Sequence, residues 1–132
     1  MNVKSILLGI QSPDERKRLI RSLTYEDYRV FGAENLLSLL ETLNNYRIDM
    51  LISEADFPGI PMTDLLSYLR SKYFDLKVIL TTREYSPEIE LKLRPFKILY
   101  IMAWPVNEQL LQSIVARGLE VGRNGFACAC TQ

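Results

Sequence analysis

Short apolar runs alternate with amphipathic segments along this chain, and this alternation limits the possible folds more than any other feature. Residues 4–10, 49–54 and 78–82 are apolar enough to predict strands that are buried on both faces. Residues 28–33 and 99–103 predict two further strands, the first of them more polar and at a sheet edge. Strands that alternate with helices favour a parallel, doubly wound sheet in a three-layer α/β/α sandwich.

Helix signals fill the intervals between these runs. Ser12 can cap a helix that begins at Pro13, and Glu15 can complete a capping box. Leucines at helical spacing predict further helices over 36–43 and 62–72. The first helix carries a basic cluster, and a solvated helix face explains it better than a nucleic-acid site does. The residues expected to face water are Arg16, Lys17, Arg18 and Arg21.

The segment after residue 85 carries mixed signals. Ser86 and Pro87 are typical of a helix start, whereas residues 88–93 alternate polar and apolar side chains with the period of a strand. We predict a short helix here that Pro95 ends. Asn107 is then expected to cap a last helix. The side chains expected to point inward from that helix are Leu110, Leu111, Ile114 and Val115.

The composition is that of one ordinary globular domain, which we place over residues 1–122. The chain has 132 residues, of which 48% are hydrophobic and 24% are charged. Its 16 basic and 16 acidic residues give no formal net charge, so neither nucleic acid nor an anionic membrane is expected as a partner. No apolar run approaches the roughly 20 residues that a membrane span requires. These features predict a cytoplasmic protein.

Histidine is absent from the sequence, which removes the commonest general base and metal ligand. Both cysteines, Cys128 and Cys130, lie in residues 123–132, which we expect to be a flexible tail or the start of a linker. Their spacing does not suit a disulfide framework, and a zinc site would need further ligands. We therefore predict reduced thiols and no metal or cofactor.

A single carboxylate marks the end of the third predicted strand. Glu54 follows the apolar run directly, Pro58 and Gly59 then form a turn, and Pro61 opens the next helix. Ligands of open α/β sheets bind at the carboxyl ends of the strands, so this position suits chemistry or signalling.

Residues 49–60, DMLISEADFPGI, resemble the third strand, acceptor position and following turn of bacterial response regulator receiver domains, the CheY-like family. The spacing onward to Thr82 and to Trp104-Pro105 also fits, as does Ser12-Pro13 after the first strand. The resemblance covers residues 4–121 and implies a flavodoxin-like sheet with strand order 2-1-3-4-5.

The resemblance also implies a site, which this sequence has largely lost. In the family an acidic pair holds magnesium, an aspartate accepts phosphate, a threonine or serine closes the fourth strand, and a lysine before a proline closes the fifth. The aromatic switch residue of the fifth strand corresponds to Ile101. The remaining equivalent positions here are Ile10 and Gln11 for the acidic pair, Glu54 for the acceptor, Thr82 for the threonine, and Trp104 with Pro105 for the lysine and proline.

These replacements argue against aspartyl-phosphate chemistry. Magnesium prefers several oxygen ligands, and only Glu54, the Gln11 carbonyl and backbone oxygens remain. Trp104 brings no positive charge to a phosphoryl group, and Glu54 is one methylene longer than aspartate. We therefore predict a degenerate pseudo-receiver without enzymatic activity.

Three side chains near the site allow alternatives. Arg83 is expected either to pair with Glu54, as a substitute for the lost lysine, or to point into solvent. Glu54 either mimics a phosphorylated acceptor or is a residual polar group, and we favour the second reading. Asp56 as a substitute acceptor is disfavoured, because an aspartate in a turn commonly accepts backbone hydrogen bonds.

Family members signal through the face formed by the fourth helix, fifth strand and last helix. That region is rich in aromatic residues here, which suits a surface for an unidentified protein partner or for self-association. The candidate residues are Tyr85, Phe96, Tyr100 and Trp104. The alternative is that several of them fill the core. A phosphorylation-independent signalling module is thus the leading hypothesis, followed by an atypical receiver phosphorylated at Glu54 and, more weakly, by a small-ligand-binding domain.

Overall fold

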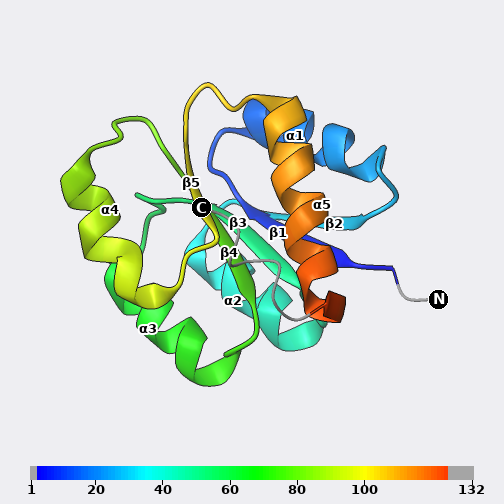
Figure 1. Cartoon of the computed structure of the whole chain (residues 1–132). Coiled ribbons are helices and arrows are strands. Elements are labelled where there is room, and N and C mark those ends of the chain that lie inside the picture. The colour runs from blue at the N-terminus through cyan, green and yellow to red at the C-terminus, as the bar shows by residue number, and fades with distance from the viewer. Residues whose placement is uncertain (1–2, 125–132) are drawn as a thin grey trace.

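A parallel sheet of five strands forms the middle layer of the molecule, and helices cover both of its faces (Figure 1). The computed structural model describes residues 3–124. The strand order is β2-β1-β3-β4-β5, which confirms the order implied by the resemblance. The strands are β1 (Ser5–Gly9), β2 (Arg29–Ala33), β3 (Met50–Glu54), β4 (Lys77–Thr82) and β5 (Tyr100–Ala103). The helices are α1 (Pro13–Thr24), α2 (Leu36–Asn45), α3 (Met62–Lys72), α4 (Pro87–Leu93) and α5 (Glu108–Asn124), with a 3-10 turn η1 (Arg94–Phe96) after α4.

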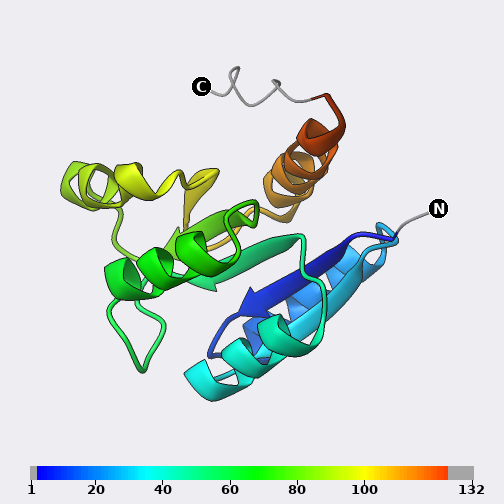
Figure 2. The ribbon, with the colours of Figure 1, turned by 90° about the horizontal axis from the view of Figure 1, so that it is seen from below.

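The sheet separates two apolar cores. On one face Leu39 of α2 and Leu66 of α3 pack against Leu51 of β3. On the other face Leu19 of α1 and Leu111 of α5 belong to the second core. In Figure 2, which looks from below, α2 and α3 lie in front of the sheet. Each helix therefore buries one apolar stripe, as the leucine spacing predicts.

The three central strands are buried and the two outer strands are partly exposed. All residues of β1 and β3 are buried, and only the first residue of β4 is not. Strand β2 has only exposed and half-buried residues before Ala33, and it lies at an edge of the sheet, as predicted. Because a parallel sheet needs cover on both faces, the apolar runs of the central strands require helices on each side.

The predicted helix caps are confirmed. Ser12 Oγ accepts a hydrogen bond from the Glu15 N–H (3.3 Å), and Ser86 Oγ accepts one from the Ile89 N–H (3.2 Å). Asn107 Oδ1 accepts from the Leu110 N–H at 3.0 Å. These bonds satisfy backbone donors that the first helical turn leaves without partners.

Helix α4 forms although its sequence alternates with the period of a strand. Ile89 and Leu93 stand four residues apart, so the helix turns both toward the α2–α3 core, where Leu93 is buried. The same turn leaves Leu91 outside, with 62% of its surface exposed. Pro95 lies in η1 and ends the helix, as predicted.

The last helix departs from the prediction in one respect. Leu110 was expected to point inward but is 41% exposed, because it lies beside the buried Leu111 on the first turn. Helix α5 continues to Asn124. The cysteines of the predicted tail lie outside the described residues. No helix within residues 3–124 is long and apolar enough to cross a membrane.

Gly59 shapes the turn that follows β3. Its φ of +106° lies in a region that side chains with a Cβ rarely adopt. A Cβ built there would also come within 2.9 Å of the Leu36 Cβ, closer than such atoms approach in proteins. The turn therefore requires glycine for both its backbone conformation and its contact with α2.

We expect Gly59→Ala to lower the free energy of unfolding by about 1–3 kcal/mol, because a residue with a Cβ is strained in this backbone conformation. Urea denaturation followed by far-UV circular dichroism measures the change. Asp56→Ala, at an exposed position of the same loop, is the matched control and should leave stability nearly unchanged. Equal stability of the two variants would contradict the role assigned to Gly59.

Candidate functional site

The carboxyl ends of the central strands bring the predicted site residues to one edge of the sheet. Glu54 of β3 stands beside Thr81 of β4, and Thr82 stands beside Ala103 of β5. Trp104 follows β5 directly, and its N–H donates to the Thr82 carbonyl (2.9 Å). Parallel strands place these positions together even though up to 50 residues separate Glu54 from Trp104 in sequence.

The Glu54 carboxylate is buried and already has hydrogen-bond donors. Only 4% of Glu54 is exposed. Its Oε1 accepts from the Gln11 backbone N–H at 3.0 Å and from the Gln11 side-chain Nε2 at 3.4 Å. Gln11 was expected to offer a carbonyl oxygen to a metal ion. Instead it serves as a donor that satisfies the carboxylate.

Ile10, at the other position of the acidic pair, is part of the core. Its side chain is fully buried in the cluster between the sheet and helices α1 and α5. Its backbone carbonyl accepts a hydrogen bond from Arg16 Nη1 at 2.6 Å, and the Gln11 carbonyl accepts from the same atom at 3.2 Å. The loop after β1 therefore presents neither carboxylates nor free carbonyl oxygens of these two residues.

Arg16 was expected to face water, and this prediction is wrong. Only 16% of its side chain is exposed, because its stem lies over Gly32 of β2, where an added Cβ would come within 3.0 Å of Arg16 Cδ. Besides the two loop carbonyls, its guanidinium approaches Glu34 at 3.6 Å. A fixed cation thus binds the loop oxygens that a divalent metal ion could otherwise use. Among the described residues, no group of three or more acidic, cysteine or histidine side chains could hold a metal ion.

Trp104 occupies the lysine position as a half-buried side chain. Its indole Nε1–H donates to Thr81 Oγ1 at 3.0 Å, and its ring packs against the core of the α1–α5 face. Thr81 is fully buried, so this bond satisfies a hydroxyl that water does not reach. Sequence reasoning missed Thr81, because the family motif assigns a role only to the next residue.

Thr82 keeps the residue type of the family, and its hydroxyl is engaged within its own turn. Thr82 Oγ1 accepts a hydrogen bond from the Glu84 N–H at 3.3 Å. The side chain is 7% exposed. Thr82 and Glu54 therefore have different hydrogen-bond partners at this edge, Glu84 for the hydroxyl and Gln11 for the carboxylate.

Arg83 pairs with Glu15 and not with Glu54, so the proposed Arg83–Glu54 pair is wrong. Its Nη2 donates to Glu15 Oε1 at 2.8 Å, and its guanidinium lies 4.9 Å from the centre of the Trp104 ring. The alternative expected a side chain that points into solvent, and 56% of the Arg83 side chain is indeed exposed. The start of α1 shares this edge of the sheet, and that placement is the signal that could have suggested Glu15.

The remaining predicted positions divide between core and surface. Ile101 is half-buried and packs against the α2–α3 core, as does Phe96. Tyr85 and Tyr100 are 49% and 41% exposed. Asp56 is exposed in the turn after β3. Pro105 follows Trp104 through a cis peptide bond. Two of the four aromatic candidates for a binding surface are therefore accessible, and the other two support it from the core side.

Solved structures share this fold. A CheY-like response regulator receiver domain protein from Methanospirillum hungatei JF-1 matches with a TM-score of 0.86 at 19% identity, over 94% of this chain and 99% of that one. The signal receiver domain of an HD domain-containing protein from Pseudomonas fluorescens Pf-5 matches with a TM-score of 0.85 at 22% identity, over 93% and 99%. The chemotaxis response regulator CheY4 of Vibrio cholerae matches with a TM-score of 0.80 at 21% identity, over 89% and 99%.

Neither a protein-family model nor a curated protein sequence matches this chain. The chain has the fold of CheY-like response regulator receiver domains, and this confirms the resemblance seen in residues 49–60. The likeness in structure therefore extends over nearly the whole chain, while the residues of the site differ from those that the resemblance implies.

We expect Thr81→Val to lower the free energy of unfolding by about 1–3 kcal/mol, because the indole N–H of Trp104 loses its acceptor within the protein. The emission of Trp104, the only tryptophan, should change as well. Urea denaturation and fluorescence spectra measure the two effects. Thr82→Val is the matched control, since its hydroxyl accepts only from a turn N–H, and it should leave the emission unchanged. An unaltered spectrum in Thr81→Val would contradict the assigned bond.

Proposed function

We propose that this chain is a phosphorylation-independent, receiver-like module of two-component-type signal transduction that acts in the cytoplasm through protein–protein contacts. The observation that carries the proposal is the buried Glu54 carboxylate, which accepts two hydrogen bonds from Gln11. Both bonds end at Oε1 and stabilise the negative charge of the carboxylate, which makes it a poorer nucleophile toward a phosphoryl donor.

The charges around Glu54 support the same conclusion. Phosphoryl transfer depends on metal ions and fixed cations that neutralise the developing charge. Arg16 is bound to loop carbonyls, and the charge of Arg83 is balanced by Glu15. Trp104 supplies an uncharged ring where the family has a lysine. Arg16 and Arg83 thus each bind a partner other than Glu54, and neither contact places a positive charge on the Glu54 carboxylate.

A phosphomimetic role for Glu54 receives less support. Such a role requires the carboxylate to act on the threonine that closes β4. Thr82 Oγ1 instead accepts from the Glu84 N–H, while Glu54 accepts from Gln11. The half-buried Ile101 also lacks the hydroxyl group that an aromatic switch residue such as tyrosine carries. We therefore favour a residual structural carboxylate over a fixed active-like state.

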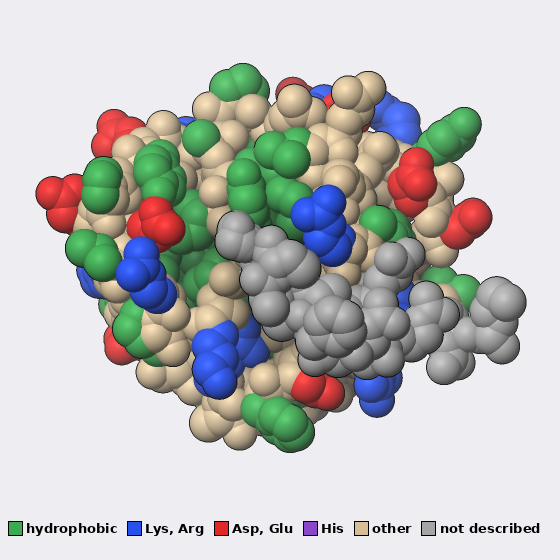
Figure 3. All heavy atoms as spheres, in the orientation of Figure 1, with side chains coloured by type: hydrophobic (Ala, Val, Ile, Leu, Met, Phe, Trp, Pro, Cys, Tyr) green, Lys and Arg blue, Asp and Glu red, His purple; other side chains and the backbone are tan. Residues whose placement is uncertain are grey.

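The face formed by α4, β5 and α5 is the surface we assign to a partner. It exposes Tyr85, Leu91, Tyr100 and Leu110. In Figure 3 apolar side chains gather over α4 and between it and the start of α5. The Tyr85 hydroxyl donates to Glu90, and this hydrogen bond raises the pKa of Tyr85. Accessible tyrosine and leucine side chains are suited to anchor a protein partner or a second copy of this chain.

The phosphorylation proposal is tested by titrating magnesium and then beryllofluoride, a phosphoryl mimic, while following Trp104 fluorescence. We expect no saturable change, because the site lacks the acidic pair and the acceptor carboxylate is occupied. The double variant Gln11→Asp with Glu54→Asp restores two carboxylates and should gain weak magnesium binding. A receiver domain with an intact site serves as the positive control. A saturable response of the native chain at modest magnesium would overturn the proposal.

The surface proposal is tested with the double variant Leu91→Ala with Tyr100→Ala. We expect it to weaken binding of the natural partner, or self-association, by about 2 kcal/mol or more, as loss of an aromatic anchor does at interfaces. Sedimentation velocity measures self-association, and pull-down from the source cell followed by titration measures partner binding. Phe74→Ala is the matched control, because Phe74 is an exposed aromatic residue just after α3 that belongs to none of α4, β5 and α5. Equal losses in both variants would contradict the assignment.

A further inference from the structure

A cavity with both polar and apolar lining residues lies at the opposite edge of the sheet, where the central strands begin. It has a volume of about 600 Å³, within the ~300–1,000 Å³ of typical small-molecule sites. Its lining comes from the residues just before β1, the segment between α2 and β3, the segment between α3 and β4, and the last helix. The whole sheet therefore separates it from Glu54 and from the edge described above.

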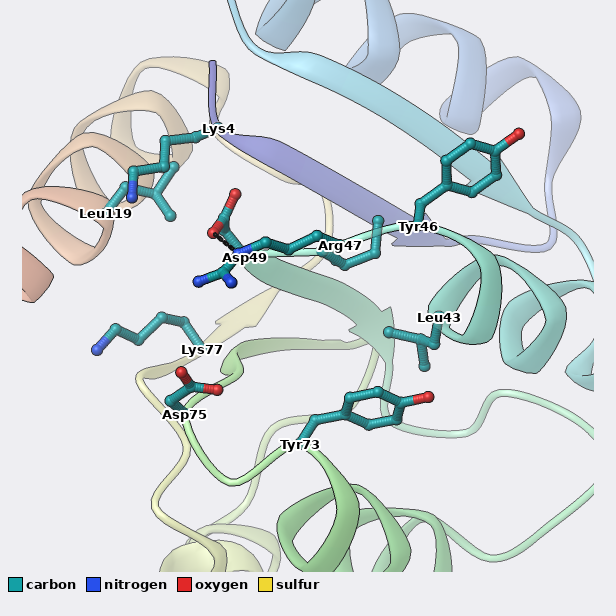
Figure 4. Close-up of a pocket in the computed structure, with 10 residues that line it drawn as sticks. Lys4, Leu43, Tyr46, Arg47, Asp49, Tyr73, Asp75, Lys77 and Leu119 are labelled. Carbon is teal, nitrogen blue, oxygen red and sulfur yellow. Dashed lines mark ion pairs between the residues drawn. The ribbon is translucent and has the colours of Figure 1, made fainter. Parts of the chain in front are cut away.

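One wall of the cavity is basic. Lys4, Arg47 and Lys77 line it, and Figure 4 shows the nitrogen atoms of all three on the same side of the cavity. Within residues 3–124, neither Lys4 nor Lys77 forms an ion pair. Two ammonium groups in one concave site repel each other unless an anion lies between them. The wall is therefore suited to receive negative charge from outside the chain.

The carboxylates of the cavity do not cancel this charge. Asp49 Oδ2 accepts a hydrogen bond from the Ser5 N–H at 2.8 Å, and its Oδ1 lies 3.8 Å from Arg47 Nε. Asp49 is thus committed to the backbone of β1 and to one of the three cations. Asp75 is the other acid of the lining. Three cations against two carboxylates leave one net positive charge, which favours an anion of low charge.

The backbone around Asp49 holds this wall in place. The Asp49 N–H donates to the Ser5 carbonyl (2.9 Å), and the Lys77 N–H donates to the Asp49 carbonyl (3.2 Å). Lys4 precedes Ser5 in the chain, so the stems of both lysines start from hydrogen-bonded strand ends. A site whose side chains start from fixed backbone loses less entropy when it binds a ligand.

The opposite wall is apolar and aromatic. Leu43 lines it together with the rings of Tyr46 and Tyr73, which Figure 4 shows on the side away from the lysine nitrogens. The Tyr46 ring packs against Phe31 with their centroids 4.6 Å apart, which restrains it. The Tyr73 ring has Lys72 Nζ 5.5 Å from its centre. A ligand that fills the cavity would therefore meet cations at one end and Leu43 with the two tyrosine side chains at the other.

We propose that this cavity binds a small organic anion that joins a phosphate or carboxylate group to a flat apolar ring. The anionic group lies between Lys4, Arg47 and Lys77, and the ring lies against Leu43, Tyr46 and Tyr73. The site is independent of the receiver-like edge, so it could serve as a ligand input to a module that does not depend on phosphorylation.

Phenyl phosphate is the probe, with inorganic phosphate and phenol as its two halves. Amide chemical shifts of the full chain are followed by NMR during each titration. We expect phenyl phosphate to shift the amide signals of Lys4, Asp49 and Lys77 saturably. Inorganic phosphate and phenol should each bind at least about tenfold more weakly, since each half of the ligand contributes on the order of 1.4 kcal/mol to the binding free energy. Inorganic phosphate or phenol binding as well as phenyl phosphate would overturn the proposed ligand class. Absence of a saturable shift at these amides would overturn the site.

Lys4→Gln and Lys77→Gln are expected to weaken phenyl phosphate binding about tenfold each, because each removes a charge-assisted hydrogen bond to the anion. Lys97→Gln removes an exposed cation that does not line the cavity and should leave the affinity unchanged. Equal affinities in all three variants would overturn the basic wall. None of these substitutions touches Glu54 or Trp104, so the outcome is separable from that of the magnesium titration.

Discussion

Strands β1, β3 and β4 are covered by helices on both faces, and the other features of the molecule depend on this burial. Their side chains leave no apolar face to water, so polar groups can appear only where the strands end. Polar and charged residues from distant segments of the sequence therefore meet at the two ends of these strands, which we call the carboxyl edge and the amino edge of the sheet. The carboxyl edge holds Glu54, and the amino edge holds Asp49.

The two edges treat their carboxylate and their cations differently. At the carboxyl edge Glu54 accepts hydrogen bonds from Gln11, Arg83 pairs with Glu15, and the ring of Trp104 lies beneath Arg83. Burying a carboxylate costs free energy unless hydrogen bonds compensate it, and the amide donors of Gln11 provide that compensation without a metal ion. At the amino edge, Asp49 is satisfied by backbone, but Lys4 and Lys77 have no ion-pair partner among the described residues. These contacts support our two proposals, that the first edge does not carry out phosphate chemistry and that the second binds an anion.

Much of the fold could be predicted because its signals are local. Apolar runs, leucine spacing and the caps at Ser12, Ser86 and Asn107 each specify an element from a few neighbouring residues, and all are confirmed. Prediction was weaker where two local signals disagreed. Around residues 88–93 the cap outweighed the period-two pattern, because a helix still buries Leu93 while leaving Leu91 in water.

By itself, the sequence determined the order of strands and helices, the edge position of β2, and which side chains stand where a receiver domain would have its acids and lysine. Only the tertiary structure decided what those side chains contact. Arg83 and Glu15 are 68 positions apart, and Gln11 and Glu54 are 43 apart, so their pairing depends on how strands and helices pack. Long polar side chains can reach several partners, and local sequence contains no distance between them. The cavity beside Lys4 and Lys77 could not be predicted for the same reason, because it forms only where the fold brings three separate strand ends together.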